Sequence, residues 1–463
     1  MLTKNKTVEL EITDLNNLGY GVGRHEGMVV FVAGGVPGDR AAVKIIKVTP
    51  SYAVGKLEEV LVSSPDRIEN DCGARGCGGC IYRNISYECE LGLKRASAEA
   101  ALRSQGLRDC EVAPVVSTGV TEGYRNKAQY PIGLEKGKYR IGFYAPKSHR
   151  ITGEGFGECL LAPPVFEEIS RELITLFERF RPSVYDEESG EGLLRHIYLR
   201  RGEITGEILL TLVINGESLP HAEEYARVLC ERFPDIVGFV LNINTASGNV
   251  ICGDRYVTVS GRGYIYDELC GVRLRIGPDA FYQVNRACAE RLYSRAVEEA
   301  DLTARDTLID VYCGIGSIGL AVARVTGGLR ALLGVEISRG AVENARENAR
   351  ENGADGYARF YAADASDLSE ILEYPENRDL AKAEGGKLVV LLDPPRAGCS
   401  EALIDTVTSL GAERIVYISC NPRTLARDVV AFVNKGYVPG RFVPFDMFPR
   451  TGHVECVVCL TRA

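Results

Sequence analysis

The chain has 463 residues, of which 45% are hydrophobic and 25% are charged, and its formal net charge is −9. This length suits about three domains, and the composition is that of a globular protein, which excludes a disordered or fibrous chain. The negative charge weighs against nucleic-acid binding by the surface as a whole. Neither the apolar core of a secretory signal nor a run of membrane-spanning length is present, so we expect a cytoplasmic protein without a membrane segment.

Residues 8–62 contain short alternating apolar stretches separated by turn signals. The turns are expected at Asn16-Asn17, Glu26-Gly27, Gly34-Gly35 and Pro37-Gly38. Period-two alternation between such turns predicts a small antiparallel β-barrel, which we assign to a first domain of residues 1–62. Barrels of this kind often bind oligonucleotides.

A second domain, residues 63–275, is expected to mix sheet and helix. It begins with a group of cysteines, followed by a helical pattern over 87–105 that Gly106 ends. Strands are predicted at 138–145, 207–214 and 237–244, and a helix at 222–233. This pattern is typical of an α+β domain.

Residues 276–463 change to a repeated strand-then-helix rhythm. Strands are predicted at 307–312, 331–336, 388–392 and 414–419, a helix at 340–353 and a last strand at 453–462. Alternation of this kind predicts an α/β domain with a parallel, doubly wound sheet.

The stretch "DVYCGIGSIG" places a glycine-rich turn between a predicted strand and a predicted helix. Gly314 and Gly316 allow backbone amides to approach a ligand at a helix N-terminus, and Glu336 ends the next strand, where an acidic residue can accept hydrogen bonds from a ribose. A dinucleotide and S-adenosyl-L-methionine both fit this pattern, and the spacing from Asp310 onward is more typical of methyltransferases. Asp364 and Asp393 follow later strands at the same sheet edge. Ordinary turn glycines and structural aspartates are the alternative.

Cys420 lies at the tip of the strand in "RIVYISCNPRTLARD". A thiol in this position suits a buried core residue, a metal ligand or a nucleophile, and only the thiolate form attacks. Glu455, near the start of the last predicted strand, is the candidate general base. Taken singly, Cys420 is more simply interpreted as a buried structural thiol and Glu455 as an exposed strand residue. A loop that binds a methyl donor at the same edge favours a catalytic role for both.

The chain has 15 cysteines, and without an export signal metal binding or catalysis is a better use for some of them than a disulfide framework. Cys72, Cys77 and Cys80 have the spacing C-x4-C-x2-C, which is typical of metal ligands. Cys159, in glycine-rich surroundings, is the candidate fourth ligand. An iron–sulfur cluster and a zinc ion are both open on this spacing, as is the absence of any metal.

Basic residues are concentrated between residues 72 and 150 of this acidic chain. A tyrosine-bearing stretch within it suits phosphate contact and base stacking. The residues proposed for RNA contact are Arg125, Lys127, Lys136, Lys138 and Arg140, with Arg195, Arg200 and Arg201 in addition.

Several motifs in order resemble one known family. They are "CGGC", "YRNKAQYPIG", "FYQVN", "DVYCGIGSIG", "LLDPPRAG", "ISCNPRTLARD" and "DMFPRTGHVE". The chain is similar over nearly its whole length to RNA uracil-5-methyltransferases, and most closely to the bacterial 23S rRNA (uracil-C5)-methyltransferases. The first cysteine gap departs from many relatives by one residue, and Ser317 stands where some carry Asn.

The resemblance implies a TRAM domain at the N-terminus, a central domain and a C-terminal Rossmann-like methyltransferase domain. It implies S-adenosyl-L-methionine contacts from Gln283, Tyr312, Glu336 and Asp393. It implies a [4Fe-4S] cluster on Cys72, Cys77, Cys80 and Cys159. Cys420 is then the nucleophile that adds to C6 of a uracil, and Glu455 accepts the C5 proton. The expected partner is RNA, most closely 23S rRNA, and no obligate protein partner is indicated.

Three alternatives stay open at this point. The same chemistry on transfer RNA is one. A cytosine-C5 methyltransferase would use a cysteine after the D-P-P-like strand, where this chain has Pro395 and Arg396 with Cys399 nearby. A non-catalytic iron–sulfur or RNA-binding protein that keeps the fold is the third.

Overall fold

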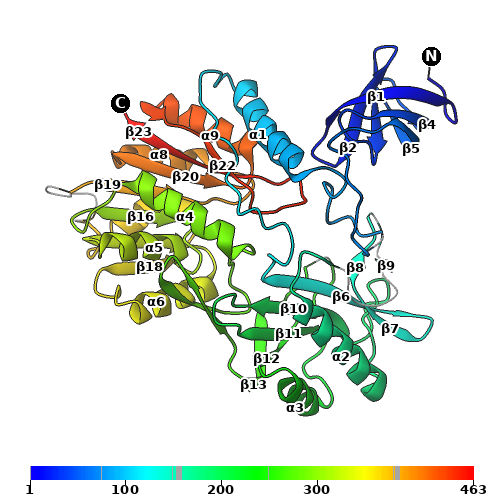
Figure 1. The fold of residues 1–463 in the computed structure, drawn as a ribbon. Helices are drawn as coiled ribbons and strands as arrows, with labels where there is room; N and C mark the ends of the chain where they lie inside the picture. Colours follow the sequence, from blue (N-terminus) through cyan, green and yellow to red (C-terminus); the bar gives the residue numbers. More distant parts are fainter. Residues whose placement is uncertain are drawn as a thin grey trace.

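The computed structural model describes residues 2–463 except 75, 147, 149, 153–158, 249, 379 and 381–385. The strands form a closed barrel, a six-stranded sheet, an eight-stranded sheet and two small hairpins. Figure 1 shows the barrel at the upper right, the six-stranded sheet below it and the eight-stranded sheet at the left. Within the described ranges, no helix combines the length and apolar character needed to cross a bilayer.

The N-terminal barrel closes in the order β1-β2-β3-β5-β4. Its strands are β1 (Thr7–Leu15), β2 (Tyr20–His25), β3 (Met28–Ala33), β4 (Arg40–Val48) and β5 (Tyr52–Val62). Alternate residues of β1, such as Val8 and Leu10, point into the barrel core. The predicted barrel is confirmed, but its all-antiparallel character is wrong. Because β5 inserts between β3 and β4, it pairs in parallel with β3.

The central sheet has the order β13-β12-β11-β10-β6-β7. Its strands are β6 (Lys127–Glu135), β7 (Lys138–Ile141), β10 (Leu194–Arg201), β11 (Ile208–Ile214), β12 (Ile236–Ile243) and β13 (Arg255–Gly261), and a hairpin of β8 (Phe143–Tyr144) and β9 (Ile151–Thr152) lies beside them. The helices α2 (Pro164–Phe180) and α3 (Ala222–Arg232) share one core with this sheet and cover the same face of it (Figure 1). The predicted mixture of sheet and helix is confirmed.

The eight-stranded sheet has the order β18-β17-β16-β19-β20-β23-β21, with β22 also paired to β23. Its strands are β16 (Thr307–Val311), β17 (Ala331–Glu336), β18 (Ala358–Ala362), β19 (Leu388–Leu392), β20 (Arg414–Ser419), β21 (Tyr437–Pro439), β22 (Val443–Phe445) and β23 (Glu455–Arg462). The strands from β16 to β20 are parallel to one another, and β23 joins β20 antiparallel. The predicted doubly wound sheet is confirmed.

Helices cover both faces of this sheet. One core contains residues of α4 (Arg286–Ala300), α5 (Ser317–Thr326), α6 (Arg339–Glu351) and the hairpin of β14 (Ile265–Leu269) and β15 (Val272–Ile276). The core on the other face contains residues of α1 (Tyr87–Ser104), the short η1 (Ala365–Asp367), α7 (Leu368–Leu372), α8 (Glu401–Ser409) and α9 (Pro422–Val433). Two packed faces explain why the strands are continuous apolar runs.

Side-chain caps start several helices directly after the strand ends. Ser338 accepts a hydrogen bond from the Ala341 amide and Asn421 from the Arg423 amide, and Pro422 occupies the first turn of α9. Because these caps turn the chain abruptly, the residues between each strand and the next helix remain at the sheet edge.

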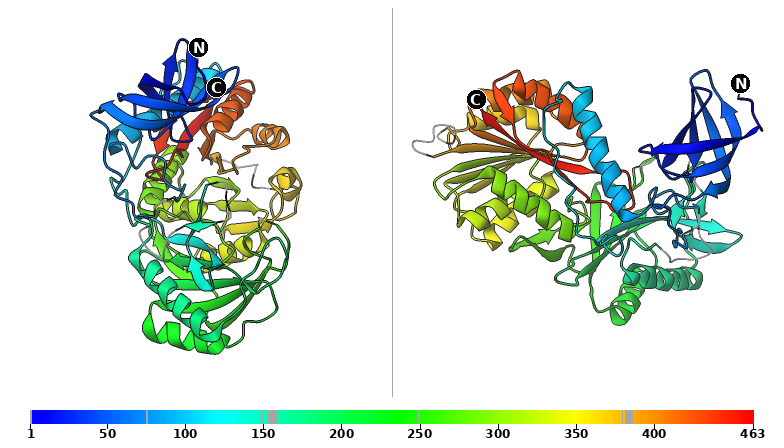
Figure 2. Two further views of the ribbon diagram at one scale, coloured as in Figure 1. Left: turned by 90° about the vertical axis from the view of Figure 1, so that its right-hand side faces the viewer. Right: turned by 45° about the horizontal axis from the view of Figure 1, so that its top comes forward.

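Helix α1 lies on the eight-stranded sheet, although it precedes the central sheet in sequence. Ala98 and Leu102 share a core with Phe432 of α9. The segment that follows α1 extends the sheet, since the Ala113 amide donates to the Phe442 carbonyl at 2.8 Å. Figure 2 shows α1, in light blue, beside the orange and red elements.

Candidate active site

The carboxyl ends of the parallel strands meet at one edge of the eight-stranded sheet, where ligands of open α/β sheets bind. Most of the predicted site residues follow these ends. Residues 312–316 follow β16, Glu336 ends β17, Asp364 follows β18, Asp393 follows β19 and Cys420 follows β20. The topology therefore brings the residues predicted to contact S-adenosyl-L-methionine and the predicted nucleophile to one edge.

The glycines of the loop after β16 have different structural reasons. A Cβ added at Gly314 would meet no atom within 4 Å, so this side of the loop has open space. Gly316 has φ 77°, which favours glycine, and an added Cβ would lie 3.0 Å from the Phe360 ring. At Gly319 an added Cβ would lie 2.8 Å from Oδ2 of Asp310, so glycine lets α5 pack closely on β16.

Glu336 ties the end of β17 to this loop. Its Oε2 accepts a hydrogen bond from the Gly314 amide at 3.2 Å, and its Oε1 accepts one from the Ser338 amide at 2.8 Å. A carboxylate has about four lone-pair positions, so two of them remain for the hydroxyl groups of a ligand.

Asp310 lies beneath the loop and is 1% exposed. Its Oδ2 accepts a hydrogen bond from the Gly319 amide at 3.0 Å, and its Oδ1 has no hydrogen-bond partner in the described part of the chain. Burial raises the pKa of this carboxyl group to about 8. A buried acceptor of this kind beside an open loop fits a polar ligand with donor groups.

The other predicted donor residues differ in their surroundings. Gln283 is buried, and its carbonyl accepts a hydrogen bond from the Asn126 side chain at 2.9 Å. Tyr312 has φ 66°, a left-handed conformation that costs a non-glycine residue about 1–2 kcal/mol. Asp364 is exposed and accepts hydrogen bonds from the hydroxyl and amide of Ser366, which lower the pKa of its carboxyl group.

The strand pairing places Cys420 beside Glu455. Ser419 pairs with Cys456 in the antiparallel ladder of β20 and β23, so Cys420 and Glu455 are the next residues along it. Cys420 is half-buried, whereas Glu455 is 5% exposed. A thiol and a carboxyl group therefore meet at the edge that carries the glycine loop.

Burial and neighbouring charges disfavour the ionised forms of these groups. Burial and then the Asp393 carboxylate raise the pKa of Glu455 to about 8, and burial raises the pKa of Asp393 to about 7. Burial, followed by Glu455 and Asp393, raises the pKa of the Cys420 thiol. The Arg396 guanidinium opposes both shifts, at Cys420 and at Glu455.

Arg396 is a site residue that the sequence analysis did not find. In the sequence it stands out only as one of the two residues found where a cytosine-C5 methyltransferase would carry its cysteine. The available signal was its position in the loop that follows β19, the strand next to β20, because charges close to neighbouring strand ends influence one another.

The cysteines predicted as metal ligands line one cavity of about 360 Å³. They are Cys72, Cys77, Cys80 and Cys159. Burial raises the pKa of the Cys77 thiol, the backbone amide of Gly79 opposes this shift, and the neighbouring Cys159 and Cys72 add to it. Among the described residues, no group of three or more His, Cys, Asp or Glu side chains is arranged to hold a metal ion.

Two of the proposed RNA-contact arginines are buried, and for them the prediction is wrong. Arg195 is 4% exposed and donates to the Asn244 carbonyl at 2.7 Å. Arg200 is 2% exposed and donates to the Ala280 carbonyl at 2.5 Å. Arg195 thus binds a backbone carbonyl inside the central part, and Arg200 binds one in the C-terminal part.

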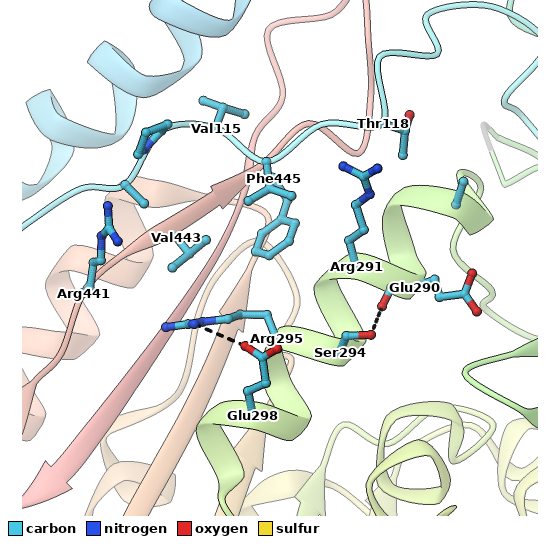
Figure 3. A pocket seen from close by; sticks show the side chains of 14 residues that line it. Val115, Thr118, Glu290, Arg291, Ser294, Arg295, Glu298, Arg441, Val443 and Phe445 are labelled. Atoms are coloured by element: carbon cyan, nitrogen blue, oxygen red, sulfur yellow. Dashed lines mark hydrogen bonds and ion pairs between the residues drawn. The ribbon is translucent and has the colours of Figure 1, made fainter. Parts of the chain in front are cut away.

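A cavity of about 790 Å³ lies between α4, residues 113–118 and β22. Figure 3 shows Val443 and Phe445 between the surrounding arginines, with Arg295 paired to Glu298. Phe445 pairs with Glu455 across the β22–β23 ladder, so one strand separates this cavity from the predicted base.

Comparison with known proteins gives matches over the whole chain. Residues 254–463 match the family described as tRNA (Uracil-5-)-methyltransferase, and residues 2–58 match the TRAM domain. An uncharacterized RNA methyltransferase of Clostridium tetani is 37% identical over 99% of this chain and 97% of its own length. One of Listeria monocytogenes is 36% identical over 99% of this chain and 98% of its own length.

A solved structure is also similar over the full length. The tRNA (uracil-54, C5)-methyltransferase of Pyrococcus abyssi, in complex with S-adenosyl-L-homocysteine, has a TM-score of 0.76 and 27% sequence identity. The match covers 98% of this chain and 99% of that chain. The similarity therefore includes the barrel, the central part and the sheet with the candidate site.

Glu336→Gln is expected to weaken the binding of S-adenosyl-L-homocysteine about tenfold or more, since charged hydrogen bonds contribute about 1.5–3 kcal/mol. Isothermal titration calorimetry measures the affinity. Glu343→Gln, at an exposed position of α6, the helix that follows β17, is the control and should bind as the unchanged protein does. Equal affinities for both variants would contradict the role of Glu336.

Proposed function

The chain belongs to the family of RNA uracil-5-methyltransferases, and we propose that it methylates C5 of a uridine through a covalent bond between Cys420 and C6. The observation that carries this proposal is the β20–β23 register, which puts a thiol and a carboxyl group side by side at the edge of the donor loop. The family membership agrees with the resemblance found in the sequence motifs, and it makes the chain an S-adenosyl-L-methionine-dependent RNA methyltransferase.

The proposed reaction uses Cys420 first and Glu455 last. The Cys420 thiolate adds to C6 of the uracil, and the electrons of the C5–C6 double bond move to make C5 nucleophilic. S-adenosyl-L-methionine, when bound, supplies the methyl group that C5 takes up. The Glu455 carboxylate then removes the C5 proton, the C5–C6 double bond forms again, and the bond from C6 to sulfur breaks to release the thiolate.

The raised pKa values of Cys420 and Glu455 are consistent with these two proposed roles. A base whose pKa lies near the working pH is effective in proton transfer, and the pKa of Glu455 is raised to about 8. The thiolate of Cys420 needs a nearby positive charge, since burial raises its pKa, and Arg396 supplies one.

The donor is proposed to bind at the glycine loop. The residues proposed to hold it are Gln283, Tyr312, Gly314, Gly316, Glu336, Asp364 and Asp393. Support comes from the open space at Gly314 and from the free lone pairs of Glu336 and Asp310. Of the proposed contacts, Asp364 is exposed and already accepts hydrogen bonds from the neighbouring Ser366.

The proposed substrate is 23S rRNA, and the target uridine must leave its base stack to reach Cys420. The resemblance of the motifs supports rRNA, and the TRAM match supports RNA binding by the barrel. Transfer RNA is the second candidate, favoured by the similarity to the Pyrococcus abyssi enzyme. We propose the division into residues 1–62, 63–275 and 276–463, with RNA contacts from the first two.

A [4Fe-4S] cluster on Cys72, Cys77, Cys80 and Cys159 is also proposed. Support comes from their shared cavity and from their thiol chemistry, since thiolates are the ligands that such clusters use. Burial raises the pKa of the Cys80 thiol, and Arg83, which is 4% exposed, opposes this shift and would favour the thiolate form. The cluster would join the segment around residue 80 to the segment around residue 159.

RNA that contains 5-fluorouridine is expected to trap a covalent complex, because fluorine at C5 cannot be removed as a proton. A denaturing gel should show the complex with the donor present, and none with Cys420→Ala. Parallel reactions with a 23S rRNA fragment and with tRNA identify the substrate. Cys399→Ala is the matched control and should still form the complex. If neither RNA gives a complex, the covalent mechanism is wrong.

The value of kcat/KM is expected to rise with pH through about 8, because Glu455 and Cys420 both act in their deprotonated forms. Arg396→Gln removes a charge that lowers both pKa values, so it should move this rise to higher pH. Arg423→Gln, an exposed arginine in the first turn of α9, should leave the profile unchanged. An unshifted profile for Arg396→Gln would show that its charge does not act on these groups.

Protein purified without oxygen is expected to be brown and to contain iron, as measured by elemental analysis. Cys80→Ser should lose the iron because one ligand is replaced. Cys110→Ser changes a half-buried cysteine outside the cavity and should retain it. A colourless protein that contains zinc would refute the iron–sulfur assignment.

A further inference from the structure

Residues 446–454, which we call the Glu455 loop, connect β22 to β23 and lead directly into Glu455. Distant parts of the chain hold the backbone of this loop. The Asn285 side chain donates to the Met447 carbonyl at 3.2 Å, and the Tyr124 hydroxyl donates to the Pro449 carbonyl at 3.0 Å. The loop is therefore positioned from outside its own sheet.

The centre of this arrangement is Lys94 of α1. Its Nζ donates to Oδ1 of Asp446 at 2.5 Å, to the Phe448 carbonyl at 3.1 Å and to Oε1 of Glu90 at 2.7 Å. Lys94 is 2% exposed, Asp446 1% and Glu90 0%. The ammonium group thus contacts the start and the middle of the Glu455 loop through a network that water does not reach.

Glu90 extends the network to the far part of the loop. Its Oε1 also accepts a hydrogen bond from the Arg450 amide at 2.7 Å. Arg450 has φ 69°, a left-handed conformation that persists in a non-glycine residue only where the surroundings enforce it. The Arg450 carbonyl accepts hydrogen bonds from the amides of Ile81 and Tyr82 at 2.9 and 3.2 Å.

The sequence positions on α1 suit this task. Glu90 and Lys94 are four residues apart and lie on one helix face, and Tyr87, one turn earlier, donates from its hydroxyl to Oδ2 of Asp446 at 2.6 Å. A buried ion network costs desolvation free energy, and apolar packing would attach the helix without that cost. The network differs from apolar packing in that hydrogen bonds are directional, so each bond fixes the position of one atom of the loop.

We propose that Lys94 is a positioning residue for Glu455 that acts in the removal of the C5 proton. The inference rests on the proposed function. Cys420 follows β20 and shares the β20–β23 ladder with Glu455. Among the described residues, the hydrogen bonds of Tyr87, Lys94 and Glu90 go to the Glu455 loop and to one another, not to Cys420, so this network supports the base and not the thiol. Weakening the network displaces the base and leaves the attacking thiol in place.

The affected step is the last one. The Glu455 carboxylate takes the C5 proton, the C5–H electrons form the C5–C6 double bond, and the sulfur leaves C6 as a thiolate. If this step alone is slow, the methylated uracil stays bound to Cys420. Adduct formation, which precedes it, keeps its rate.

Lys94→Met keeps a similar length and removes the charge. With ordinary RNA and donor, we expect kcat to fall about tenfold or more and covalent RNA–protein complex to accumulate on a denaturing gel. With 5-fluorouridine RNA, the rate of trapping should stay within about twofold of the unchanged protein. Deuterium at C5 should slow this variant more than the unchanged protein, because proton removal has become rate-limiting.

Arg103→Met is the matched control, since Arg103 is an exposed cation near the end of the same helix. It should show neither accumulation nor a raised isotope effect. Tyr87→Phe removes one hydrogen bond of the network and should shift the same readouts in the same direction by less. This variant decides the question if Lys94→Met does not fold.

Equal losses of trapping and turnover, without accumulated complex, would overturn the positioning role and leave Lys94 a general structural residue. Failure of the unchanged protein to trap 5-fluorouridine RNA would overturn the proposed function, and this inference with it. Trapping by the unchanged protein together with normal turnover by both variants would overturn the inference alone.

Discussion

The antiparallel ladder between β20 and β23 is the constraint on which the candidate site depends. At the edge that carries the candidate site, the parallel strands end, so their site residues follow the strands. The antiparallel strand β23 begins at this edge, so its first residue, Glu455, lies there. Cys420 and Glu455 meet because β20 ends where β23 starts. A slip of one residue would turn Glu455 to the opposite face, so the apolar packing on both faces also protects the pairing of thiol and base.

Burial gives this edge its electrostatic character. Asp310, Asp393 and Glu455 are carboxyl groups at or near one sheet edge, and each has a raised pKa. Asp310 is 1% and Glu455 5% exposed, and the Arg396 guanidinium influences the ionisation of Glu455 and Cys420. The proposed reaction uses a thiolate and a carboxylate, and burial, which disfavours both ionised forms, is opposed here by the charge of Arg396.

Much of the architecture could be predicted from local patterns. Strands β17, β19 and β20 were predicted with their observed bounds because strands packed on both faces are uninterrupted apolar runs. The edge location of the glycine loop and of Cys420 followed from the same alternation. Patterns within a few residues carry this information because strand burial and helix capping are local properties.

Contacts between distant segments could not be predicted in this way. The parallel pairing of β3 with β5 depends on the order of barrel closure, which no short stretch records. Lys94 and Arg200 are charged residues of the kind usually found at the surface, and their burial depends on partners such as Asp446 and the Ala280 carbonyl. The roles of such residues can be inferred only from the folded structure, which shows the partners they contact.

The position of α1 has a consequence for how this protein can change in evolution. Its catalytic sheet is completed by a helix and an edge segment from the first quarter of the chain, and Gly452 lies so near the barrel that an added Cβ would be 2.9 Å from the Asn17 carbonyl oxygen. Recombination that exchanged the N-terminal part for that of another protein would remove supports of the candidate active site. The barrel, the helix and the catalytic sheet are therefore expected to be inherited together, as one unit rather than as interchangeable modules.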